Sequence, residues 1–145
     1  MKRHPDLQSL SRDHHQALVV AQRLKHVDDK DAIAARAAFL EFWHRHGQLH
    51  FRVEEEVLLP GFANAGGAED PGVARVLREH AEIRFRALQL QGDTASAQAQ
   101  RALGELLAAH VRFEEGELFP AIEATLSREE LSAMASALAT AERGS

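Results

Sequence analysis

The chain has 145 residues, a length that suits one domain with one hydrophobic core. Its composition, 45% hydrophobic and 27% charged, excludes a wholly disordered protein, and no apolar run approaches the roughly 20 residues that cross a bilayer. The net charge of −5 argues against a nucleic-acid partner, and the lack of cysteine excludes disulfides and thiolate metal sites.

Alanine and leucine are abundant and β-branched residues are scarce, which favours helices over strands. Apolar residues recur at helical spacing, so we predict bundle helices at about 9–27, 31–59, 71–91 and 94–120, and a shorter helix at 128–142. This pattern predicts an all-α protein, an up-down-up-down four-helix bundle with an extra short C-terminal helix, in a single domain over residues 1–145. A dimer of helical hairpins is the alternative architecture.

Local signals set the expected start of the first helix and the expected ends of the second and fourth helices. Ser9 or Ser11 can cap the first helix with its hydroxyl oxygen. Pro60 is expected to end the second helix, and Pro120 the fourth, because proline lacks an N–H and clashes with the preceding turn.

Further signals mark the later helices. Asp70-Pro71 is typical of an N-cap followed by proline at the first helical position. Asp93 or Thr94 is expected to precede the fourth helix, and Ser127–Glu130 has the pattern of a capping box.

An internal repeat contains the residues that point to chemistry. Residues 50–60 read HFRVEEEVLLP and residues 110–120 read HVRFEEGELFP, and six of the eleven positions are identical. Each copy has a His four residues before a Glu, a spacing that places both side chains on one face of a helix. The preceding helix of each hairpin adds one further inward histidine, His14 or His80. The antiparallel arrangement brings all four helices' polar side chains to one level of the core.

Four imidazoles and two carboxylates in an apolar core require cations, because a buried carboxylate without a partner is strongly destabilising. This donor set suits iron, manganese or zinc, and two carboxylates that each bridge give a dinuclear site. Two six-coordinate ions would leave roughly two positions open for a small molecule. Without metal, we expect Glu54 and Glu114 to take up protons.

The pattern resembles a known family. The residues that carry the resemblance are Asp13-His14, His50-x-x-x-Glu54-Glu55, Glu79-His80 and His110-x-x-x-Glu114-Glu115. They resemble the hemerythrin-like family, also called the HHE cation-binding domain, over nearly the whole chain, including the helix at 128–142. The resemblance implies a non-haem di-iron site bridged by carboxylates. The metal ligands that it implies are His14, His50, Glu54, His80, His110 and Glu114.

The neighbours of His80 and one extra histidine set this sequence apart. Oxygen-carrying hemerythrins place two histidines four residues apart on the third helix, whereas Val76 and Arg84 flank His80 here, which argues against reversible oxygen carriage. An extra histidine, His46, stands one turn before His50 and has no counterpart in the second repeat. It is a candidate fifth histidine ligand, a residue that orients a ligand, or neither.

The resemblance and the residues together predict a function. We expect two iron ions, with manganese or zinc as alternatives, in a protein that binds O2 or a related small molecule such as peroxide or nitric oxide. Such a protein would act in the response to oxygen, oxidative stress or nitric oxide. A di-iron peroxidase-type or iron-handling stress enzyme is the alternative, although no acid–base pair stands apart from the ligands. We expect a monomer or homodimer in the cytoplasm, without a signal peptide, a membrane partner or a nucleic-acid partner.

Overall fold

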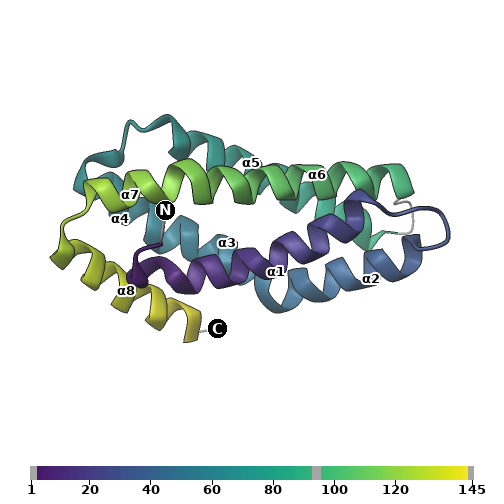
Figure 1. The fold of residues 1–145 in the computed structure, drawn as a ribbon, viewed down its shortest axis with the longest axis horizontal. Coiled ribbons are helices and arrows are strands. Elements are labelled where there is room, and N and C mark those ends of the chain that lie inside the picture. Colours follow the sequence, from purple (N-terminus) through teal and green to yellow (C-terminus); the bar gives the residue numbers. More distant parts are fainter. Residues whose placement is uncertain (1–2, 93–95, 144–145) are drawn as a thin grey trace.

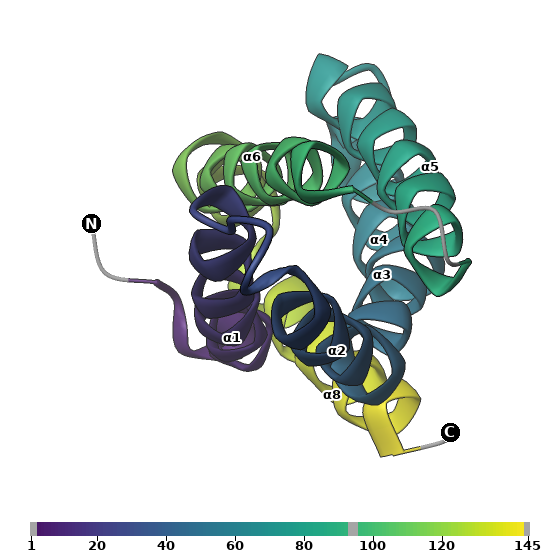
Figure 2. The same cartoon turned by 90° about the vertical axis from the view of Figure 1, so that its right-hand side faces the viewer.

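The computed structural model describes residues 3–92 and 96–143, and these residues form helices and no strands. Four long helical segments run alongside one another, and viewed end-on they surround a common axis (Figures 1 and 2). The last helix, α8 (Arg128–Arg143), lies obliquely across one end of the bundle (Figure 1). The all-α bundle is therefore confirmed. Among the described helices, none combines the length and apolarity needed to cross a membrane.

The first segment is α1 (Gln8–Lys25), which follows a short 3₁₀ turn at Pro5–Leu7. The predicted caps are wrong, because Ser9 and Ser11 lie inside α1. The chain becomes helical earlier, since Nδ1 of His4 accepts a hydrogen bond from the backbone N–H of Asp6 at 3.1 Å and starts the turn.

The second segment is much longer than predicted. It consists of α2 (Ala32–Phe42), α3 (Gln48–Val53) and α4 (Leu59–Phe62), joined and followed by π-helical turns at Trp43–Gly47, Glu54–Leu58 and Ala63–Gly67. It breaks at Gly66, whose φ of 121° is a left-handed conformation that glycine adopts without strain.

Proline does not end this segment, so the predicted boundary at Leu59 is wrong. In an α-helix the ring of Pro60 would clash with the carbonyl four residues earlier. The wider turn at Glu54–Leu58, in which the Leu59 N–H donates to the Glu54 carbonyl, gives that ring room. The second copy of the repeat has the same wider turn before Pro120, where Glu114–Leu118 leads into α7 (Phe119–Thr125).

The third and fourth segments are α5 (Pro71–Gln91) and α6 (Ala97–Phe113), with α6 continuing through the turn at Glu114–Leu118 into α7. The predicted cap at Asp70 is confirmed, since its carboxylate accepts the Gly72 N–H at 2.7 Å. Ser96 caps α6, while the predicted caps Asp93 and Thr94 lie outside the described residues.

The capping box before α8 is also confirmed. The Ser127 N–H donates to the Glu130 carboxylate at 2.9 Å, and the Glu130 N–H donates to the Ser127 hydroxyl oxygen at 3.1 Å. This reciprocal pair gives α8 a defined start after the turn at Leu126.

The hydrophobic core has two parts. One cluster, which includes Phe39, Trp43 and Leu103, fills the end of the bundle near the link between α5 and α6. The other, which includes Phe62 and Phe119, fills the end covered by α8. Buried polar side chains from α1, α3, α5 and α6 lie between the two clusters, as His14 does between Leu10 of one cluster and Ala17 of the other.

Candidate metal centre

The structure brings the six predicted ligand residues together. They come from four segments, and each is at most 7% exposed. The residues are His14 on α1, His50 on α3, Glu54 after α3, His80 on α5, His110 on α6 and Glu114 after α6.

The six side chains form two overlapping groups. In the first, the imidazole nitrogens of His14 and His50 and carboxylate oxygens of both glutamates lie within 4.8 Å of one another. In the second, nitrogens of His80 and His110 lie equally close to oxygens of the same two glutamates. Each group offers two nitrogens and two oxygens, and each glutamate belongs to both groups. This arrangement fits two ions that share a pair of carboxylates.

Unpaired atoms test whether the cluster fits a metal. Among the described residues, Oε1 of Glu54, Oε2 of Glu114 and Nε2 of both His80 and His110 are buried without a hydrogen-bond partner. Nε2 of His80 lies 3.0 Å from Oε1 of Glu54, but the two are not aligned for a hydrogen bond. Buried polar atoms left unpaired are costly, and they converge here as metal ligands do. The donor set therefore fits a cation.

The far nitrogen of every core imidazole contacts a carboxylate. Nδ1 of His80 lies 2.7 Å from Oε2 of Glu55, and Nδ1 of His14 lies 2.6 Å from Oε2 of Glu115. Both glutamates belong to the sequence motifs that carry the family resemblance.

The four carboxylates that contact the far nitrogens of the imidazoles form an outer layer of the site. For two of them, the sequence did not predict this contact. Nδ1 of His50 lies 3.0 Å from Oδ2 of Asp13, and Nδ1 of His110 lies 2.8 Å from Oε1 of Glu79. The signal was present in the repeated Asp-His and Glu-His pairs, since neighbours on a helix point about 100° apart. An acid beside one inward histidine therefore faces the histidine of the next helix.

Arginines hold two of these outer carboxylates. Arg84 donates from both terminal nitrogens to Glu55, at 2.7 and 3.0 Å, and Arg75 donates to Glu79 at 3.1 Å. Arg84, one turn after His80, is one of the two positions, with Val76, at which the sequence lacks the second histidine of the oxygen-carrying pattern. Its guanidinium supports His80 through Glu55.

The charges within the cluster shift the pKa values of its histidines and of Glu114. Burial disfavours charged imidazoles, but the carboxylates, Glu114 foremost, outweigh it and raise the pKa of His80 to about 10 and that of His110 to about 9. Burial likewise raises the pKa of Glu114, but the surrounding histidines lower it well below its usual range. The expected protonation of Glu114 is therefore wrong, because in the metal-free cluster the imidazoles take the protons.

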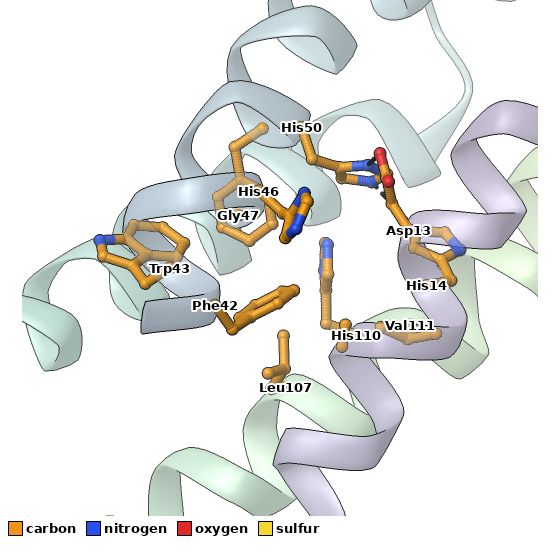
Figure 3. Close-up of a pocket in the computed structure, with 12 residues that line it drawn as sticks. Asp13, His14, Phe42, Trp43, His46, Gly47, His50, Leu107, His110 and Val111 are labelled. Carbon is orange, nitrogen blue, oxygen red and sulfur yellow. Dashed lines mark hydrogen bonds and ion pairs between the residues drawn. The ribbon is translucent and has the colours of Figure 1, made fainter. Parts of the chain in front are cut away.

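His46 lies outside both groups of converging atoms among the described residues. It is exposed, and it projects from the turn at Trp43–Gly47 into a small cavity lined also by His14, His50 and His110 (Figure 3). The cavity offers about 10 Å³ to the centre of a water-sized molecule. Most of its other lining is hydrocarbon, from side chains such as Phe42.

A bundle that surrounds histidines and shared carboxylates defines the class of helical proteins with carboxylate–histidine metal centres. A family comparison identifies the member of this class. The model of the hemerythrin HHE cation binding domain matches residues 6–122, and the chain belongs to that family. The match ends before α8, so the resemblance over residues 128–142 is not supported by it. Neither a curated protein nor a solved structure matches the chain significantly.

Proposed function

We propose that this protein binds two iron ions, one held by His14 and His50 and the other by His80 and His110, with Glu54 and Glu114 bridging both. The observation that carries this proposal is the pair of buried four-residue groups that share both glutamates. A single ion would leave one pair of buried imidazoles without a metal ion to bind. Membership of a cation-binding family supports the same reading.

The choice of iron rests on the donors. Imidazole and carboxylate suit iron, manganese and zinc, whereas the absence of cysteine removes the thiolates that favour softer ions. Four carboxylates behind the imidazoles, from Asp13, Glu55, Glu79 and Glu115, add negative charge that favours a highly charged ion.

The second part of the proposal is that a small molecule binds beside the His14–His50 pair. With two nitrogens and two shared oxygens from the protein, each ion keeps coordination positions free. The cavity at His14 and His50 has the size of one small molecule. The ligand that we propose is O2, peroxide or nitric oxide, because iron when bound supplies one-electron chemistry and open coordination positions to such a molecule.

Metal analysis with visible spectroscopy tests the proposal. The purified protein, loaded with ferrous iron and exposed to air, should contain about two iron ions per chain. It should absorb in the visible through ligand-to-iron charge transfer, and dithionite should bleach that absorption. One ion at saturation would overturn the dinuclear proposal. Zinc retained in preference to iron, without visible absorption, would overturn the choice of metal.

A further inference from the structure

His46 occupies a distinctive place in the molecule. Its side chain lines the cavity beside His14 and His50, and it also lines two surface grooves, one with His15 and one with Glu142. It therefore stands between solvent and the cavity. Figure 3 shows its ring turned toward the space that the rings of His50 and His110 also face.

The imidazole of His46 has no role in the fold that the structure reveals. Within the described residues it makes no hydrogen bond or ion pair, and its contact with Phe42 is a tilted one at 6.5 Å between ring centroids. By contrast, His44 on the same turn lies with Nε2 3.2 Å from the Gln91 side-chain nitrogen and lines a different groove. A polar ring without a partner at the edge of a hydrocarbon cavity is available to a ligand.

The local backbone turns His46 toward the cavity. The chain at Trp43–Gly47 is a π-helical turn, which changes the helical phase between the aromatic residues before it and His50 after it. Gly47 permits this packing, because a Cβ there would lie 2.6 Å from the Trp43 ring. The turn thus packs Trp43 into the core and leaves His46 at the cavity.

We propose that His46 hydrogen-bonds a small ligand held in this cavity on the His14–His50 ion. The ligand class is a diatomic or triatomic molecule or anion with a terminal atom that accepts a hydrogen bond. This inference rests on the proposed metal site and adds to it the residue that contacts the bound ligand. His46 is thereby a ligand-contacting residue and not a metal ligand, since its ring lies outside both four-residue groups.

Azide is the probe that tests this role. The iron-loaded, air-oxidised protein is titrated with azide, and binding is followed by the visible absorption and by calorimetry. Compared with the wild type, His46→Ala should keep both iron ions and weaken azide binding about tenfold, the effect of one hydrogen bond lost to a charged ligand. His46→Gln keeps a side-chain N–H donor and should recover part of the affinity. His44→Ala is the matched control and should bind azide as the wild type does.

The outcomes separate this inference from the proposed function. A wild type that holds no pair of ions would overturn both. A wild type with two ions and bound azide, together with unchanged affinity in His46→Ala, would overturn only the role of His46. Loss of iron from His46→Ala in a protein that keeps the helical circular-dichroism spectrum of the metal-free wild type would show a metal ligand instead and would also overturn the inference.

Discussion

Each core imidazole uses its two ring nitrogens differently. One nitrogen faces the shared glutamates and the other contacts an outer carboxylate, as for His110 between Glu114 at 3.2 Å and Glu79 at 2.8 Å. A carboxylate at Nδ1 fixes the tautomer and leaves Nε2 free to bind a metal. The outer layer therefore orients the donors before any ion arrives.

The first prediction concerns the histidines of the repeat. His110→Ala removes one buried nitrogen donor and should reduce bound iron from about two ions per chain to one or none. His50→Ala should have the same effect, because the repeat places it equivalently. Elemental analysis after gel filtration checks both variants. Full iron content in either variant would contradict the proposed ligand set.

The second prediction concerns Arg84. Burial raises the pKa of the Glu55 carboxyl, but hydrogen bonds from His80 and then Arg84 lower it to about 2. Arg84→Met removes both guanidinium N–H donors, so this pKa should rise in part. With its carboxylate released, His80 is less well oriented, and iron affinity should fall about tenfold, as for other residues that support a metal ligand.

Competition with a chromophoric chelator measures the affinity of the Arg84 variant. Arg86→Met is the matched control, since Arg86 lies on the same helix and pairs with Glu82 at the surface. Equal affinities in the two variants would show that Arg84 does not support the site.

At the scale of helices, close approach and irregular turns decide the geometry. Gly104 lets α6 approach α1, because a Cβ there would lie 2.7 Å from the backbone oxygen of Ala21. The wider turns at Glu54–Leu58 and Glu114–Leu118 make room for the rings of the prolines that follow, and each turn begins at one of the shared glutamates. Both shared glutamates thus lie in turns that depart from regular α-helix, whereas His14 and His80 lie on regular α-helices.

The third prediction compares two glycines. Gly104→Ala forces α1 and α6 apart and should lower the free energy of unfolding by about 2–3 kcal/mol. Gly116→Ala meets nothing within 4 Å in its helical turn and should raise it by about 0.5–1 kcal/mol. Urea unfolding of the metal-free protein measures both. Equal changes in the two variants would contradict the role of close helix packing.

At the scale of the whole molecule, the polar layer divides the apolar core. Without a cation, the buried carboxylates are balanced by protonated imidazoles, and this balance depends on pH. Metal binding replaces those protons, so binding should release protons at neutral pH.

The fourth prediction follows from the sign of this linkage. His80 and His110 have pKa values of about 10 and 9 in the folded metal-free protein, above the ordinary value of 6.5. Their stabilising contribution is fully present below pH 6.5 and is lost as pH rises through 9 and 10. The free energy of unfolding of the metal-free protein should therefore fall between pH 7 and pH 10, by on the order of a few kcal/mol.

Urea unfolding at a series of pH values measures this loss. The iron-loaded protein is the control, because its imidazoles bind the ion without a proton and should not show the same fall. A metal-free protein whose stability stays constant to pH 10 would contradict the protonated cluster.

The sequence by itself determined the fold class and the inner layer of the site. The repeated His-x-x-x-Glu spacing is local information about one helix face, and it predicted four of the six side chains that converge in the core. His14 and His80 were predicted from the apolar faces of the preceding helices. The caps at Asp70 and Ser127 were found for the same reason, since each bond spans only a few residues.

Only the tertiary structure decided the features that depend on contacts between segments. Pro60 did not end its helix because a π-helical turn gives its ring room, and Val53 and Leu59 on either side of that turn pack in the core. Asp13 and Glu79 stand in repeated acid–His pairs of the sequence, but which histidine each one reaches depends on how neighbouring helices face each other. The place of His46 likewise depends on how its π-helical turn faces the neighbouring helices. Its proposed role therefore rests on the cavity and not on its position in the sequence.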